Sequence, residues 1–335
     1  MGVFMQIFST LPFQVVLLIV GFVLLIKGAD WFVEGSSSIA KRLMVPTIII
    51  GMTIVAMGTS LPEAAVSVRA SFAGNNELAV SNVTGSNLFN LLVVIGLCAV
   101  LKNVPIKRDT IKKDIPFSIG ITVIMLALGI WGMILGHADG LIFIAIFVFY
   151  LLRMITTAMN KRRSEETDGA LKEKREGASL QAALVETKPV WQSAILIGIG
   201  IVGIILGGTW VVNGASSIAT AFDLSQNLIG LTIVAIGTSL PELVTSMVAA
   251  KKGEVDLAMG NAIGSNIFNI LFVLGIAASI SPVAFNTENI VDICILIVVS
   301  IIVWLFARSG KKINRTEGIL MLVIYAAYMV YICLR

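Results

Sequence analysis

Charged residues are scarce in this chain. Only 13% of its 335 residues are Asp, Glu, Lys or Arg, whereas a soluble globular protein has about 25%. Hydrophobic residues make up 57%, and the mean hydropathy is +0.96. Such a chain has too little polar surface to face water on all sides, so its solvent is lipid. These proportions exclude a secreted domain, a cytosolic enzyme and a nucleic-acid-binding protein.

Cysteine and histidine are rarer still. The three cysteines all lie in apolar runs without metal-ligand spacing, so neither a disulfide framework nor a zinc site is expected. The single histidine, His137, lies in a short loop, which leaves a Ser-His catalytic pair without support. No basic segment precedes the N-terminal apolar run, so we interpret that run as a retained first span rather than a signal peptide.

Long apolar stretches separated by short polar turns predict an all-α polytopic membrane protein with ten transmembrane helices. The predicted spans are residues 11–36, 46–72, 78–101, 115–135, 140–158, 190–218, 227–250, 256–280, 289–307 and 317–334. One polar, highly charged segment, 159–189, interrupts them and is interpreted as a flexible or helical linker. The predicted organisation is therefore five spans in 1–158, the linker, and five spans in 190–335.

Lysine and arginine placement orients these spans. Twenty-one of the 24 basic residues fall on the side of the membrane that carries the linker. By the positive-inside rule this side is cytoplasmic, so both termini are expected outside a multi-pass protein of the cell (inner) membrane. The formal net charge of +4 is thereby interpreted as a topology signal.

The two halves repeat each other at an offset of 179 residues. The segment Gly51–Glu63, GMTIVAMGTSLPE, matches Gly230–Glu242, GLTIVAIGTSLPE, at 11 of 13 positions. At the same offset, Asn82–Asn90 (NVTGSNLFN) matches Asn261–Asn269 (NAIGSNIFN) at 6 of 9. Because each half has five spans, an odd number, the second half is expected to enter the membrane from the opposite face. Such inverted repeats are typical of secondary transporters. A structural duplication without transport is the alternative.

The first motif combines a helix break with a carboxylate. Pro62 and its repeat equivalent Pro241 each remove a helical hydrogen bond within a span, so helices 2 and 7 are expected to be broken, with backbone carbonyls freed at membrane depth. Spacings of three and four place Ala56, Ser60 and Glu63 on one helical face. A carboxylate inside a bilayer is a candidate functional residue by default. The two motif carboxylates, Glu63 and Glu242, are expected to meet where the repeats meet.

The second motif adds further oxygen atoms. Its serine and asparagine are four residues apart on one face of spans three and eight; they are Ser86, Asn90, Ser265 and Asn269. Gly85 and Gly264 are expected to allow close packing against the broken helices, and Gly260 and Gly264 have the spacing of a helix-packing motif. Carboxylate, hydroxyl, amide and carbonyl oxygens form the ligand set of hard cations such as Ca²⁺ and Na⁺. The same serines and asparagines could instead hold helices together, which is the alternative interpretation for each one taken alone.

With both signatures present twice, the sequence resembles the cation/calcium exchanger superfamily, in particular its prokaryotic sodium/calcium exchanger-like members. The resemblance covers essentially the whole chain and implies Ca²⁺ export driven by Na⁺ influx through alternating access. It implies that Glu63 and Glu242 bind Ca²⁺ and Na⁺ in turn, and that spans one and six slide to switch access. It also implies a set of further ligands: Thr59, Ser60, Ser86, Thr238, Ser239, Ser265 and the carbonyls of Ala56 and Ala235.

One departure from the superfamily pattern concerns charge. Some members have Asp at the position of Asn90 or Asn269, whereas this chain has Asn at both. Two fixed negative charges match one Ca²⁺, whereas three Na⁺ leave one excess positive charge. A proton-coupled Ca²⁺ exchanger at the same two glutamates is therefore the main alternative. An intramembrane hydrolase and a passive channel are weaker ones. The charged group Lys27, Asp30 and Glu34 in span one is expected to form ion pairs rather than bind the transported ion.

Overall fold

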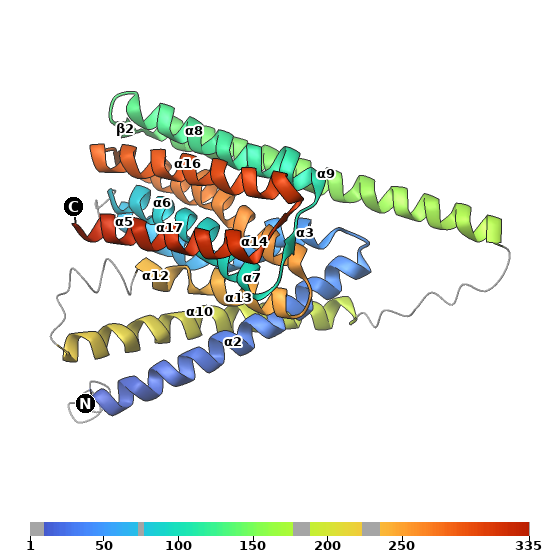
Figure 1. The fold of residues 1–335 in the computed structure, drawn as a ribbon, viewed down its shortest axis with the longest axis horizontal. Coiled ribbons are helices and arrows are strands. Elements are labelled where there is room, and N and C mark those ends of the chain that lie inside the picture. Colours follow the sequence, from blue (N-terminus) through green and yellow to red (C-terminus); the bar gives the residue numbers. More distant parts are fainter. Residues whose placement is uncertain (1–9, 73–76, 177–187, 223–234, 335) are drawn as a thin grey trace.

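The computed structural model describes residues 10–72, 77–176, 188–222 and 235–334, and these are almost entirely helical (Figure 1). Within these ranges, eight helices are long and apolar enough to cross a membrane, and a bent helix pair over Thr47–Phe72 forms a ninth span. These nine correspond to nine of the ten predicted spans. The remaining one, 227–250, is described only from Ala235 onward, and its part at 227–234 lies outside the described residues.

The first half contains five groups of helices and two short strands. They are α2 (Leu11–Arg42), α3 (Thr47–Ile50), the π-helix η1 (Gly51–Val55), α4 (Ala56–Thr59), α5 (Leu61–Phe72), α6 (Glu77–Phe89), the π-helix η2 (Asn90–Val94), α7 (Ile95–Leu101), β1 (Val104–Pro105), the π-helix η3 (Thr110–Asp114), α8 (Ile115–Ile130), β2 (Ile134–Leu135) and α9 (His137–Glu176).

The second half repeats this order. Its elements are α10 (Val190–Ala221), α12 (Ala235–Thr238), α13 (Leu240–Lys251), α14 (Val255–Phe268), the π-helix η5 (Asn269–Leu274), α15 (Gly275–Ile280), β3 (Val283–Ala284), α16 (Thr287–Gly310), β4 (Lys312–Ile313) and α17 (Arg315–Leu334). The π-helices η2 and η5 begin at Asn90 and Asn269, which are equivalent at the repeat offset.

Several helices run beyond the predicted spans. The first was expected to end at residue 36 but continues to Arg42, and the fifth was expected to end at 158 but continues to Glu176. The first part of the predicted linker is therefore an extension of α9 (Figure 1). Apolar runs mark where a helix lies in hydrocarbon, whereas polar residues such as Lys and Glu allow the same helix to continue into water.

The core of the bundle lies in the third and eighth spans. Ala79–Leu101 and Val255–Ile280 are the most buried of the candidate spans, whereas the most apolar parts of Leu11–Arg42 and Arg315–Leu334 have few buried residues. Helices α2 and α10 pack against each other along one side of the bundle (Figure 1). A Cβ atom on Gly203 of α10 would lie 3.0 Å from the Cα of Gly28 in α2, so glycine permits this close approach.

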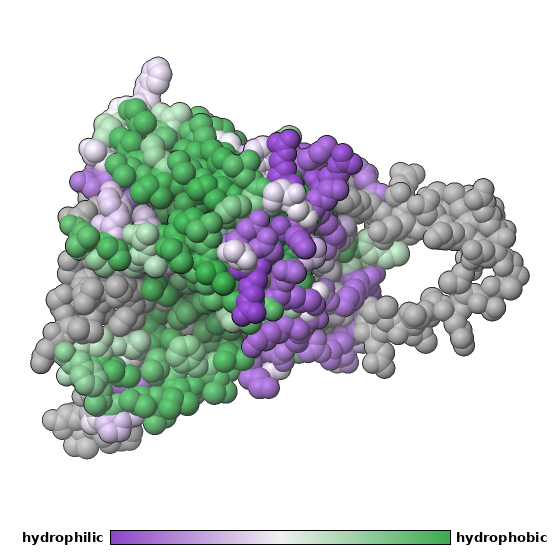
Figure 2. Space-filling model, viewed as in Figure 1, coloured by the Kyte–Doolittle hydropathy of each residue, from purple (hydrophilic) through white to green (hydrophobic). Residues whose placement is uncertain are grey.

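Two short ladders join the halves. Strand β1 pairs with β4 through Val104 and Ile313, and β2 pairs with β3 through Leu135 and Val283, both antiparallel. Each ladder therefore takes one strand from each half of the chain. The start of α2 and the end of α17 lie at the end of the bundle opposite the extension of α9 (Figure 1). Polar side chains gather at the end with that extension, and the rest of the visible face is mostly apolar (Figure 2).

Candidate cation site

Both proline-containing spans are interrupted at the serine of the first motif. Ser60 lies between α4 and α5 with φ −85° and ψ 11°, and the two helical segments around it bend by 48°. Ser239 lies between α12 and α13 with φ −92° and ψ 5°. Each break begins a new helix whose first turn contains the motif glutamate, Glu63 or Glu242. A helix N-terminus favours a carboxylate, because its first amide groups point toward it.

Each motif serine pairs with the motif glutamate of the other half. Ser60 was expected to share a helical face with Glu63, but its hydroxyl donates to Oε1 of Glu242, in the other half, at 2.7 Å. Reciprocally, the Ser239 hydroxyl donates to Oε1 of Glu63 at 3.2 Å. The spacing within one span does not indicate these partners, because each one lies in the other half of the chain. The two carboxylates and two hydroxyls, all fully buried, thereby form one cluster between the halves.

The second motif contributes its serines to the same cluster. The Ser239 hydroxyl also lies 3.1 Å from the hydroxyl of Ser86. The Ser265 hydroxyl is 3.5 Å from Oε1 of Glu242 and 3.5 Å from the carbonyl oxygen of Ala56. That carbonyl also accepts the amide of Ser60, so it is not freed by the break, although a carbonyl oxygen has a second lone pair available.

The two motif threonines differ in their burial. Thr59 is fully buried, and its hydroxyl lies within hydrogen-bond distance of the carbonyls of Val55 and Ala56 and of Oδ1 of Asn261 at 3.0 Å. Thr238 is half-buried at the end of α12, directly before the break. Ala235 begins α12.

Four asparagines form a closed network at the centre. Asn87 and Asn266 each donate from Nδ2 to the other's backbone carbonyl, at 3.3 and 3.2 Å. Asn90 donates to Oδ1 of Asn266 at 3.1 Å, and Asn269 donates to Oδ1 of Asn87 at 3.2 Å. The amide groups of the predicted residues Asn90 and Asn269 are thus held by two asparagines that the sequence analysis did not select.

A second pair of asparagines supports the glutamate helices. Asn82 donates to the carbonyl of Glu63 at 3.4 Å and to the Ser67 hydroxyl at 3.0 Å. Asn261 makes the equivalent bonds to the carbonyl of Glu242 at 3.3 Å and to the Ser246 hydroxyl at 2.9 Å. The repeat itself was the signal for these residues, since both asparagines begin the second motif.

Four buried oxygen atoms in this region accept no hydrogen bond within the described part of the chain: Oε2 of Glu63, Oε2 of Glu242, Oδ1 of Asn90 and Oδ1 of Asn269. Buried polar atoms normally have a partner, so each unsatisfied one requires an explanation. Two carboxylate and two amide oxygens are suited to a hard cation. Among the described residues, no group of three or more Asp, Glu, His or Cys gathers elsewhere in a metal-binding arrangement.

Glycine allows the two halves to approach closely beside this cluster. A Cβ on Gly51 of η1 would lie 3.0 Å from the Cα of Gly260 in α14, and a Cβ on Gly260 would be equally close to Gly51. A Cβ on Gly264 would lie 2.5 Å from the Cα of Met52. The close packing predicted for Gly260 and Gly264 is therefore confirmed. The prediction for Gly85 is wrong, because a Cβ there would meet nothing within 4 Å.

The charged residues of the first span lie apart from the cluster. Asp30 pairs with Lys252 at 2.6 Å, and Glu34 pairs with Lys188 at 2.9 Å. The expected ion pairs are present, but their lysines come from the second half and the linker rather than from Lys27, which is exposed.

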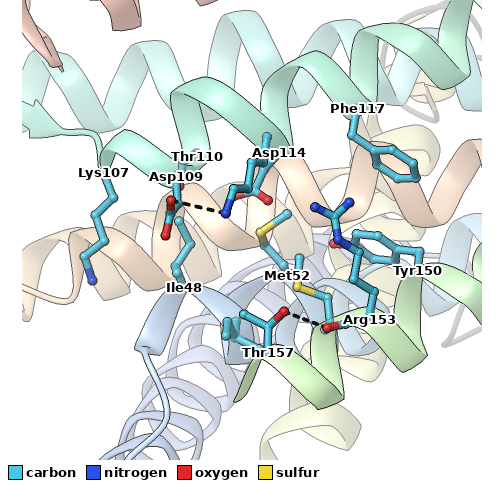
Figure 3. Close-up of a pocket in the computed structure, with 13 residues that line it drawn as sticks. Ile48, Met52, Lys107, Asp109, Thr110, Asp114, Phe117, Tyr150, Arg153 and Thr157 are labelled. Atoms are coloured by element: carbon cyan, nitrogen blue, oxygen red, sulfur yellow. Dashed lines mark hydrogen bonds and ion pairs between the residues drawn. The ribbon is translucent and has the colours of Figure 1, made fainter. Parts of the chain in front are cut away.

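A separate cavity of about 90 Å³ lies at the end of the bundle with the α9 extension (Figure 3). Residues of α3 and η1, of η3 and α8, and of α9 line it, among them Met52, Asp114 and Arg153. Figure 3 shows the ion pair of Lys113 with Asp109, at 3.5 Å, at its rim. None of the predicted cation ligands lines this cavity, so it is not the candidate site.

Comparisons with known proteins agree with this arrangement. A family model described as "Sodium/calcium exchanger protein" matches residues 13–156 and 192–334. The chain is 40% identical over 317 residues to the protein CaxA of Alkalimonas amylolytica, covering 93% of this chain and 96% of that relative. It is 29% identical over 339 residues to the sodium/calcium exchanger MaX1 of Methanosarcina acetivorans, covering 94% and 97%. A solved structure of the sodium-calcium exchanger NCX_Mj, soaked with Na⁺ and Sr²⁺, is similar with a TM-score of 0.81 and 31% identity, covering 96% of this chain and 99% of that chain.

Proposed function

Since the chain belongs to the sodium/calcium exchanger protein family, we propose that it exports Ca²⁺ in exchange for Na⁺, with both ions bound between Glu63 and Glu242. The family is one of antiporters rather than enzymes, and its members are multi-pass membrane proteins that transport Ca²⁺ and Na⁺. The observation that carries the proposal is the reciprocal pairing of each glutamate with a serine of the other half. Next to these pairs lie four buried oxygens that accept no hydrogen bond from the described residues.

We propose a ligand set of two charged and several neutral groups. Glu63 and Glu242 supply the charge, and the neutral oxygens come from Thr59, Ser60, Ser86, Asn90, Thr238, Ser239, Ser265, Asn269 and the carbonyls of Ala56 and Ala235. A hydroxyl that donates to a carboxylate directs its own lone pairs away from it, toward a bound cation. Asn87 and Asn266 are positioning residues in this proposal, because they hold the amides of Asn269 and Asn90.

The proposed architecture is ten transmembrane helices in two inverted five-helix repeats, 1–158 and 190–335, joined by the linker 159–189. The reciprocal contacts support it, since five bonds of the first half recur in the second half at an offset of 179 residues. We place the polar end of the bundle and the linker in the cytoplasm and both termini outside the cell (inner) membrane. The lysine and arginine distribution in the sequence supports this orientation.

The burial of the site supports alternating access. Both glutamates have no exposed surface, so an ion reaches them only after part of the bundle moves. We assign that movement to α2 and α10, which pack through glycines and therefore present few side chains that must be repacked as they slide. If three Na⁺ enter for each Ca²⁺ that leaves, one net charge crosses per cycle, which contributes about 2.3 kcal/mol per 100 mV.

A second candidate is H⁺/Ca²⁺ exchange at the same site. Two carboxylates with no third acidic ligand balance one Ca²⁺, and they could equally carry two protons. Asn rather than Asp at positions 90 and 269 supports this candidate, because with only two carboxylates three bound Na⁺ would leave the site with one excess positive charge.

The test is ⁴⁵Ca²⁺ uptake into proteoliposomes under imposed ion gradients. An outward Na⁺ gradient should drive uptake. Uptake that follows only an H⁺ gradient would refute Na⁺ coupling and support H⁺/Ca²⁺ exchange. Glu63→Gln and Glu242→Gln should each abolish uptake while the helix content is unchanged. Glu317→Gln is a matched control, since Glu317 caps the loop before α17 through the amide of Asn314, away from the site. Normal transport by either motif variant would refute the proposed site.

A further inference from the structure

Four basic side chains surround one hollow at the polar end of the bundle, between the start of the fourth span and the end of the ninth. The hollow has a volume of about 340 Å³, within the range of small-ligand pockets. Its lining consists of Arg108, Ile111, Lys112, Pro116, Trp304, Arg308 and Lys311. No acidic side chain is among these residues, and the two halves of the chain contribute two basic residues each. We call this hollow the basic groove.

The wall of the basic groove is held in place by Trp304. Its Nε1 donates to the carbonyl of Ile111 at 2.8 Å, which links α16 to η3. The guanidinium group of Arg308 lies over the Trp304 ring, 5.4 Å from its centroid. Such a cation–π contact orients the guanidinium but leaves its outer N–H groups free to donate. One wall of the groove is therefore fixed, and it holds the Arg308 guanidinium group in one orientation. Flexible surface lysines alone would not provide such an oriented donor.

Within the described part of the chain, the four groove cations form no ion pair with a carboxylate. At the same end of the bundle, Lys41, Lys107, Lys188 and Lys252 each form an ion pair with a carboxylate. No such pair is present for Arg108, Lys112, Arg308 or Lys311 among the residues that the structure describes. Four positive charges around one hollow repel one another unless an anion occupies it. The positive-inside rule explains their side of the membrane but not their convergence.

The mixed basic and apolar lining of the groove indicates which kind of anion it binds. The groove lies where basic residues meet an apolar floor of Ile111 and Pro116 and a half-buried tryptophan. Tryptophan and basic residues at such a boundary are typical of the lipid headgroup level, and basic pockets between transmembrane helices on the cytoplasmic side bind anionic headgroups. We propose that the basic groove binds the phosphodiester headgroup of an anionic phospholipid, which would bridge the two halves of the protein.

The proposal can be tested by lipid contact at Trp304. The full chain is reconstituted in vesicles of phosphatidylcholine and phosphatidylglycerol, with brominated acyl chains on one lipid or the other. Bromine quenches tryptophan fluorescence on contact, and the difference from Trp304→Phe isolates the signal of this residue among the five tryptophans. We expect about a tenfold preference of the Trp304 position for phosphatidylglycerol over phosphatidylcholine.

The variants separate the groove from the general surface charge. Arg108→Gln with Lys112→Gln removes two groove charges without altering the Arg308–Trp304 contact, and should remove most of the preference. Lys251→Gln with Arg315→Gln removes the same charge from exposed positions outside the groove, and should keep it. Equal quenching by both lipids in the unmodified protein, or equal loss in both double variants, would overturn the proposal. Competition by soluble glycerol phosphate would show that a free phosphate, not a lipid, occupies the groove, and would overturn it too.

Discussion

Gly264 lies where α14 of the second half contacts η1 of the first half, and replacing it by alanine should separate them. A Cβ at this position would lie 2.5 Å from the Cα of Met52, 2.8 Å from its carbonyl oxygen and 2.9 Å from the Cβ of Ala56. Carbon atoms in contact are normally about 3.5–4.0 Å apart. All three obstructing atoms belong to the backbone or to a Cβ, so no rotamer change relieves the clash. The two helices would have to move apart by about 1 Å.

The separation should cost stability and weaken ion binding together. Overpacking of a well-packed core typically costs about 1–3 kcal/mol, and we expect Gly264→Ala to lie at the upper end because backbone must move. The next residue, Ser265, lies 3.5 Å from both the Ala56 carbonyl and Glu242 Oε1. A shift of about 1 Å would take its hydroxyl out of reach of both groups. Ca²⁺ should therefore protect the variant less than the unmodified protein.

The assay is thermal unfolding of the purified protein with and without Ca²⁺, with Gly120→Ala as control. Gly120 lies within α8, and a Cβ there meets nothing within 4 Å. Alanine should be neutral or stabilise that helix by up to about 1 kcal/mol. If Gly264→Ala unfolds at the temperature of the unmodified protein and shows the same Ca²⁺-dependent increase, the packing argument is refuted.

Two further predictions address other buried or paired groups. Asn87→Ala should destabilise the protein by about 1–3 kcal/mol and reduce Ca²⁺ protection in the same thermal assay, because Asn269 Nδ2 loses its acceptor; unchanged Ca²⁺ protection would remove Asn87 from the positioning role. Burial raises the pKa of Glu254, but hydrogen bonds from Lys41 and Ser37 outweigh it and leave the pKa below its usual value near 4.5. The stability that this lowered pKa provides is fully present above pH 4.5 and is lost as the pH falls through the lower pKa of the folded state. Acidification below pH 4.5 should therefore lower the free energy of unfolding of the unmodified protein more than that of Glu254→Gln. The difference should be less than about 1 kcal/mol, because the Lys41 side chain is exposed to solvent. Identical dependence of the unfolding temperature on pH in the two proteins would contradict this.

Much of the fold could be predicted from local patterns. Nine of the ten apolar runs are helical spans, and both prolines follow a break, because lipid forces backbone groups to pair within a helix and proline prevents one such bond. The ends of α2 and α9 could not be predicted from hydropathy, since a helix does not end where the hydrocarbon ends.

The site was predicted less completely, because its contacts cross between the halves. The motifs identified Glu63 and Ser60, but the bond of Ser60 to Glu242 joins the two halves and is not indicated by either motif alone. Asn87 and Asn266 form their network only when the third and eighth spans touch, which no spacing within one span indicates. Asn82 begins the second motif, but its bond to the carbonyl of Glu63 joins two different spans and is likewise not indicated by spacing.

The exchange of partners between the halves has a consequence for biosynthesis. Ser239 bonds Glu63, and strands β3 and β4 pair with β2 and β1, so every one of these contacts waits for the second half to be made. Until then the first half contains a span with a carboxylate that has no hydroxyl partner from the second half, which hydrocarbon disfavours by several kcal/mol. We therefore expect the helix that carries Glu63 to be shielded from lipid during insertion. The second half then supplies the hydroxyl partner and completes the bundle.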